Sequence, residues 1–165
     1  MKAILSGLGV LSKCEGRSDG TPASTCLKYK DVIISVGDRC SKGPRLRILL
    51  VEDNVYVREA FKDILEAFSY EVLDAETGSE ALALLDQSPG RIDLVISDLV
   101  MPEMNALELH EALHTVQEDV KMLLVTGYPM PKTGMALVGR ADVSWIRKPI
   151  NVPALGETVY RLIGR

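Results

Sequence analysis

The stretch VISDLVMP (Val95–Pro102) decides how the rest of this chain is interpreted. Its first residues are mostly apolar and β-branched, which is typical of a strand buried in a sheet. A single carboxylate, Asp98, ends the run and is followed by more apolar residues and a proline. Because burying an unpaired charge is costly, we expect Asp98 at the end of the strand, outside the core.

The segments around this stretch alternate between strand and helix patterns. Short apolar runs predict strands at Leu46–Val51, Tyr70–Ala75, Ile92–Asp98, Val120–Thr126 and Val143–Lys148. Apolar residues at helical spacing predict helices at Val55–Phe68, with Asn54 as N-cap, and at Gly78–Gln87, Glu103–Val116 and Val152–Ile163. Prolines and glycines leave room for only a short additional helix in Pro129–Arg140. This alternation predicts an α/β fold with a doubly wound, five-stranded parallel sheet.

The chain changes character near residue 45. Residues 1–45 hold 8 basic and 4 acidic residues, whereas residues 46–165 hold 11 basic and 19 acidic ones. In the first segment only DVIISV (Asp31–Val36) has a strand pattern. We therefore expect a flexible N-terminal extension over 1–45, of unassigned function, and one folded domain over 46–165. A solvated tail, an added edge strand and a basic segment folded over the acidic domain all stay open for the extension.

The composition excludes several classes of function. A net charge of −4 gives no basic footprint for nucleic acid. The three cysteines, Cys14, Cys26 and Cys40, form no CxxC pair and have no histidine nearby, so they indicate neither a zinc site nor a closed disulfide framework. The apolar run in MKAILSGLGVLSK is short and broken by glycine, so we expect neither a leader nor a membrane helix, and a cytoplasmic protein.

Polar residues at the predicted strand ends indicate chemistry. Ligands of a doubly wound sheet bind beyond the carboxyl ends of its strands, where Glu52, Asp53, Asp98, Thr126 and Lys148 would meet. Three carboxylates at one rim repel one another unless a cation is present, and oxygen ligands favour Mg²⁺. A carboxylate can attack phosphorus, and a metal with Lys148 would neutralise the transferred charge. The residues therefore predict Asp98 as a phosphoryl acceptor.

Four motifs in this order and spacing, LLVEDN, SDLVMPEM, LLVTGY and WIRKPI, resemble the receiver domain of two-component response regulators. The resemblance covers about Arg45–Arg165 and implies a flavodoxin-like fold with strand order 2-1-3-4-5. It implies that Asp98 accepts a phosphoryl group from a histidine kinase or phosphotransfer protein, with Lys148 contacting the phosphate. It also implies Mg²⁺ ligands from three side chains and one backbone carbonyl: Glu52, Asp53, Asp98 and Val100.

The same resemblance implies a switch. Thr126 would shift toward the phosphate, and Trp145, three residues before the lysine, would swing inward as Thr126 moves. Adding roughly −2 charge is a sufficient trigger for such a two-state element. The surface of the fourth helix, fifth strand and fifth helix would then bind an unidentified protein partner, and a homodimer is compatible with this interpretation.

Three positions depart from the family pattern. Ala106 stands where the family has glycine, which would stiffen the loop. Val100 and Tyr128 occupy positions that influence dephosphorylation in the family. Since Val100 has no side-chain donor to orient water and Tyr128 could shield the site, we expect a long-lived phosphorylated state.

We expect a phosphoacceptor domain that is not itself an enzyme, and three other interpretations compete with it. A hydrolase of the haloacid dehalogenase type also uses a strand-end aspartate, but wants a second aspartate where this chain has Val100. A flavodoxin-like cofactor binder fits the fold alone. A degenerate receiver that docks without phosphorylation is the main alternative. Because no output module follows the last helix, we expect either a free-standing receiver or one excised from a hybrid histidine kinase. The dipeptide GY after Thr126 resembles the receivers of hybrid kinases.

Overall fold

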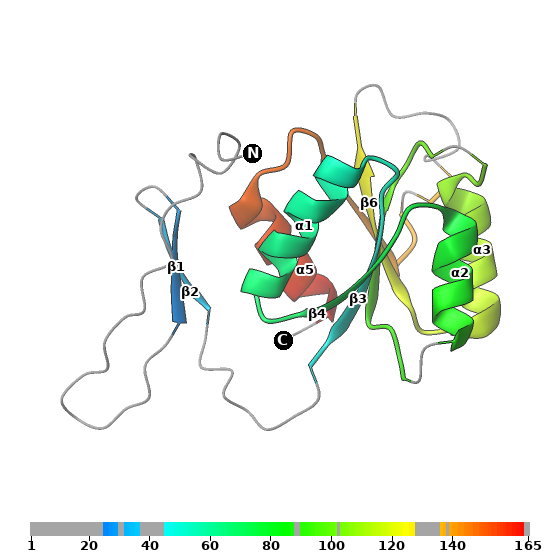
Figure 1. Cartoon of the computed structure of the whole chain (residues 1–165), viewed down its shortest axis with the longest axis horizontal. Helices are drawn as coiled ribbons and strands as arrows, with labels where there is room; N and C mark the ends of the chain where they lie inside the picture. The colour runs from blue at the N-terminus through cyan, green and yellow to red at the C-terminus, as the bar shows by residue number, and fades with distance from the viewer. Residues whose placement is uncertain are drawn as a thin grey trace. The chain divides into compact units, whose positions relative to one another are not determined.

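The structure is a computed structural model that describes residues 25–29, 32–36, 45–87, 90–101, 103–127, 136–137 and 139–163 (Figure 1). It divides into two compact units, Met1–Pro44 and Arg45–Arg165. In the first unit, β1 (Thr25–Tyr29) pairs antiparallel with β2 (Val32–Val36). The strand pattern at Asp31–Val36 corresponds to β2. The pattern gave no indication of β1, because TCLKY mixes polar and apolar residues and its strand conformation depends on pairing with β2.

The second unit is built on one parallel sheet. Its strands are β3 (Arg47–Val51), β4 (Glu71–Ala75), β5 (Leu94–Asp98), β6 (Lys121–Thr126) and β7 (Val143–Arg147). They are arranged as β4-β3-β5-β6-β7, and each neighbouring pair is parallel. Counted within this unit the order is 2-1-3-4-5, which confirms the predicted doubly wound fold.

Four described helices cover the two faces of this sheet. They are α1 (Val55–Ala67), α2 (Gly78–Gln87), α3 (Ala106–Val116) and α5 (Val152–Ile163). Figure 1 shows α1 and α5 on one face and α2 with α3 on the other. Among the described residues, none of these helices has the length and hydropathy that a membrane crossing requires. The short helix predicted in Pro129–Arg140 falls largely outside the described residues.

Helix starts follow the capping residues. Asn54 caps α1 as predicted, since its Oδ1 accepts hydrogen bonds from the backbone N–H groups of Tyr56 at 3.0 Å and Val57 at 3.3 Å. The predicted start of the next helix at Glu103 was wrong. Asn105 forms a capping box with Glu108 and so fixes the first helical residue at Ala106.

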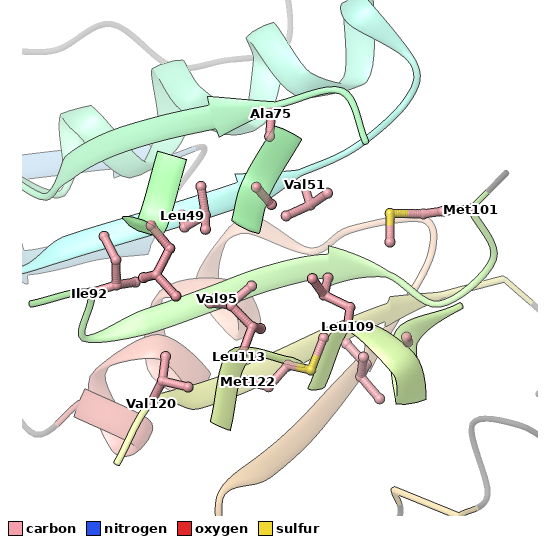
Figure 2. Packing of buried hydrophobic residues seen from close by; sticks show 14 of the residues in the cluster. Leu49, Val51, Ala75, Ile92, Val95, Met101, Leu109, Leu113, Val120 and Met122 are labelled. Atoms are coloured by element: carbon pink, nitrogen blue, oxygen red, sulfur yellow. The ribbon is translucent and has the colours of Figure 1, made fainter. Parts of the chain in front are cut away.

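The core lies on both faces of the central strands. Between the sheet and the α2–α3 layer, apolar residues from β3, β5, β6 and α3 pack together (Figure 2). On the other face α1 and α5 contribute Phe61, Leu65, Leu155 and Val159. The close approach of these two helices requires a small residue at Gly156, where a Cβ would lie 3.0 Å from Phe68 Cζ. Packing on both faces thus places the sheet between its helices, with the carboxyl ends of the parallel strands at one edge.

Candidate functional site

Three of the predicted site residues are joined by ion pairs at the carboxyl ends of the strands. Lys148 Nζ lies 2.5 Å from Asp98 Oδ2 and 3.1 Å from Glu52 Oε2. Glu52 follows β3 and Asp98 ends the neighbouring β5, whereas Lys148 follows β7 and reaches across β6. The backbone N–H of Lys148 donates to the carbonyl oxygen of Thr126 at 2.8 Å, which ties the start of this loop to β6.

Burial sets the electrostatics of this triad. Glu52 is only 3% exposed, and this burial raises its pKa above the ordinary value, although the hydrogen bond from Lys148 limits the rise. Burial lowers the pKa of Lys148, but its hydrogen bonds to Asp98 and Glu52 outweigh that effect and raise the pKa overall. The pKa of both groups is thus raised, and the two directions are compatible because one ammonium pairs with two carboxylates. Lys148 has two anionic partners that stabilise its charge, whereas buried Glu52 has one cationic partner, which it shares with Asp98.

Both carboxylate oxygens of Asp98 accept hydrogen bonds. Oδ2 accepts from Lys148, and Oδ1 accepts from the backbone N–H of Val100 at 3.0 Å. The Val100 side chain is exposed, while the Asp98 side chain is 15% exposed. Asp98 is therefore fixed in orientation at the end of its strand, and it is not buried in the core.

The remaining predicted residues are not joined to this triad through their side chains. Asp53 is exposed directly after Glu52, and among the residues that the structure describes it forms no ion pair. Thr126 is buried, and its hydroxyl donates to the carbonyl oxygen of Gly127 at 2.8 Å. Trp145 on β7 is 46% exposed, so its ring lies largely outside the core.

A second polar cluster has no counterpart in the sequence predictions. His110 Nε2 and His114 Nε2 lie 2.6 Å and 3.1 Å from the same oxygen of Asp142. Burial raises the pKa of Asp142, but the hydrogen bond from His110 and the other local contacts outweigh this and lower the pKa. The spacing of the two histidines, four residues apart on a helix, was the available signal, whereas the approach of Asp142 depends on the tertiary fold.

Comparison with known proteins agrees with the topology of the sheet. The model of the response regulator receiver domain family matches residues 48–160. The chain belongs to this family. Receiver domains are modules of two-component signalling, so the family resemblance of the four motifs is confirmed.

Individual relatives are similar over about 70% of the chain. The polar-differentiation response regulator DivK of Brucella anthropi is 31% identical over 119 residues, covering 71% of this chain and 95% of DivK. The sensor kinase CckA of Brucella abortus is 34% identical over 116 residues, which cover 70% of this chain but only 12% of that kinase.

Solved structures of receiver domains superpose on this receiver domain. The receiver domain of the hybrid histidine kinase CckA matches with a TM-score of 0.60 at 32% identity, covering 71% of this chain and 98% of that one. A CheY-like receiver domain protein from Methanospirillum hungatei matches with a TM-score of 0.66 at 32% identity, covering 73% and 95%. Relatives thus include both a small response regulator and one domain of a large kinase.

Proposed function

We propose that this receiver domain is the phosphoacceptor module of a two-component phosphorelay, in which Asp98 takes a phosphoryl group from a histidine kinase or histidine phosphotransfer protein. The observation that carries the proposal is the ion-paired triad, in which one ammonium contacts both Asp98 and Glu52. A buried glutamate, a strand-end aspartate and a lysine meet at the ends of three strands, and with a bound divalent cation this rim would suit an anionic group.

The transfer step requires little beyond positioning and charge neutralisation. A carboxylate oxygen of Asp98 attacks the phosphorus of a phosphohistidine, and the new O–P bond forms as the P–N bond breaks. The electron pair of the broken bond stays on the imidazole nitrogen of the donor. The Val100 N–H and Lys148 hold the acceptor in orientation, and the Lys148 ammonium faces the charge of the incoming group.

The donor atoms at this rim fit Mg²⁺. Carboxylate and carbonyl oxygens are its preferred protein ligands, and Glu52, Asp53, Asp98 and the backbone carbonyl of Val100 would hold the ion. When bound, Mg²⁺ supplies positive charge that offsets the charge on the transferred phosphoryl group. The exposed Asp53 carboxylate suits this role, since it has no ion pair to give up within the described structure.

The proposed output is a change of surface. The new charge at Asp98 would draw the Thr126 hydroxyl away from the Gly127 carbonyl, and Trp145 would move inward behind it. The surface of β7 and α5 would then bind a downstream protein in the cytoplasm. In this role the domain acts as a phosphoacceptor and not as an enzyme that turns over a substrate. Residues 1–45 would form a separate extension.

Intact-mass spectrometry after incubation with acetyl phosphate and Mg²⁺ tests this proposal. We expect one added phosphate on the wild type, none on Asp98→Ala and none in EDTA. Asp86→Ala is the matched control, because Asp86 is an exposed aspartate on α2, and it should be labelled like the wild type. An unlabelled wild type, or a labelled Asp98→Ala, would overturn the proposal. Absence of label with retained partner binding would favour a docking module that works without phosphorylation.

A further inference from the structure

The chain's two histidines meet one aspartate far from the proposed phosphoacceptor. His110 and His114 lie on α3, and their ring centroids are 4.3 Å apart with the planes tilted by 40°. Their Nε2 atoms lie 2.6 Å and 3.1 Å from Asp142 Oδ2. One ligand atom from each of the three residues lies within 4.8 Å of the others, so three potential metal donors converge on one point.

This cluster lies near the amino ends of the strands, whereas Asp98 lies at their carboxyl ends. Asp142 directly precedes β7, and its carbonyl oxygen accepts a hydrogen bond from the N–H of Met122 near the start of β6, at 2.9 Å. His114 lies in the last turn of α3, which returns toward the amino ends of the strands. The cluster is therefore separate from the carboxylates proposed to hold Mg²⁺.

We propose that His110 Nε2, His114 Nε2 and the Asp142 carboxylate bind a Zn²⁺ ion. Two imidazoles with one carboxylate are a common Zn²⁺ ligand set, whereas Mg²⁺ prefers oxygen ligands alone. Two histidines four residues apart on a helix present their rings on one face. Three protein ligands leave a fourth position for water or a partner's side chain.

The distances need only a small adjustment. With Zn–N and Zn–O bonds of about 2.0–2.2 Å, tetrahedral ligand atoms lie roughly 3.3–3.5 Å apart. The contacts of 2.6 Å and 3.1 Å must therefore lengthen by less than about 1 Å, and all three ligand atoms, which lie within 4.8 Å of one another, must come to this separation. The Asp142 side chain is partly exposed, so a rotation of its carboxylate can provide this movement.

Arg140 opposes this binding and thereby gives a sharp test. Its Nη1 lies 3.2 Å from His110 Nδ1, and because a guanidinium can only donate, Nδ1 is the acceptor and Nε2 carries the proton. A metal bound at Nε2 moves that proton to Nδ1, where it would face a second donor. Arg140 is exposed and can turn toward water. If residue 140 instead accepted a hydrogen bond from the protonated His110 Nδ1, the affinity of the site for the metal should rise.

Zinc bound at this site would connect α3 to the start of β7. That strand carries Trp145, and Lys148 follows it directly. The ion would therefore hold the amino end of β7, and Lys148, which follows the other end of β7, contacts Asp98.

Isothermal titration calorimetry of the full chain with Zn²⁺ tests the site. The titration is run in excess Mg²⁺, which occupies carboxylate sites, and with Cys14→Ser, Cys26→Ser and Cys40→Ser, which removes competing thiols. We expect one Zn²⁺ per chain. His114→Gln, whose amide can still donate to Asp142, should fold normally yet bind at least about tenfold more weakly. Arg140→Gln should bind about tenfold more tightly.

Nitrogen NMR of the histidine rings gives an independent readout. Zinc should shift the Nε2 resonances of His110 and His114, and the His110 proton should move from Nε2 to Nδ1. Zinc binding that is unchanged in His114→Gln would overturn the proposal. So would the absence of stoichiometric binding in the cysteine-free parent, or ring resonances that do not respond to the metal.

Discussion

Lys148→Ala removes the ammonium that pairs with both Glu52 and Asp98. Water cannot readily replace it at Glu52, because that residue is almost fully buried. Breaking a buried ion pair costs about 3–5 kcal/mol, whereas an exposed pair contributes about 0.2–1 kcal/mol. The Lys148 side chain is 30% exposed, so this pair lies between those limits. We expect the free energy of unfolding at neutral pH to fall by about 2 kcal/mol.

The loss should depend on pH in a defined direction. Burial raises the pKa of Glu52, and Lys148 limits that rise, so the substitution should raise this pKa further. A carboxyl group whose pKa is higher in the folded than in the unfolded protein is destabilising when ionised. Its cost is complete above the folded pKa and vanishes below the unfolded pKa, about 4.3 for glutamate. The difference between wild type and Lys148→Ala should therefore narrow as the pH falls toward that value.

Urea denaturation at neutral and mildly acidic pH measures this effect, and Lys62→Ala is the matched control. Lys62 Nζ also lies 2.5 Å from a carboxylate oxygen, that of Asp74, but both side chains are more exposed, at 37% and 33%. Its removal should cost no more than about 1 kcal/mol. If Lys148→Ala costs no more than Lys62→Ala, or if its cost is the same at both pH values, the reasoning from burial is wrong.

Four further predictions concern packing, capping, the switch and the lifetime of the phosphorylated state. Leu109→Ala should lower the free energy of unfolding by about 2–5 kcal/mol in urea denaturation because the side chain is fully buried, whereas Val116→Ala on the exposed part of the same helix should change it by less than about 0.5 kcal/mol. Asn105→Ala should cost about 1 kcal/mol through loss of the capping box, and Asn105→Asp should restore most of it in the same assay. Trp145 is the only tryptophan and is half-exposed, so phosphorylation should shift its fluorescence to shorter wavelength if the ring moves inward; an unchanged spectrum would contradict the switch. Since Val100 offers no side-chain donor to an attacking water, the phosphoryl label should persist well beyond seconds in Mg²⁺ buffer when followed by mass spectrometry, and loss within seconds would contradict this.

The fold could be predicted because its decisive features are local. Apolar runs such as Ile92–Asp98 and Val120–Thr126 are long enough to be buried on both faces, and the alternation with amphipathic helices permits few topologies. The start of α3 was predicted too early, at Glu103, in the segment before its apolar face. Asn105 accepts from the N–H groups of the first turn and so sets the start at Ala106.

For three of the predicted site residues, the sequence indicated that they would lie at one edge of the sheet but not how they would pair. Parallel strands bring their carboxyl ends to one edge, so Glu52, Asp98 and Lys148 were expected to meet. Lys148 reaches across β6 to contact both Glu52 and Asp98. This contact depends on side-chain packing, which sequence spacing does not encode. The same reason hid the His110 cluster, since Asp142 lies 32 residues away and reaches the histidine only through the β6–β7 pairing.

The charges at the rim explain why a divalent cation and the acceptor depend on each other in the proposed reaction. With Glu52, Asp53 and Asp98 ionised and Lys148 protonated, these four side chains carry a net charge of −2. A phosphoryl group carries about −1.5 to −2 and replaces one carboxylate charge of −1, so phosphorylation makes the rim more negative by about 0.5 to 1 unit. Lys148 already serves two carboxylates and cannot offset this alone. Coupling between two bound groups is reciprocal. If phosphorylation of Asp98 raises the affinity of the rim for a cation, the bound cation favours phosphorylation of Asp98 by the same factor. Chelation and Asp98→Ala therefore probe one linked equilibrium from its two sides.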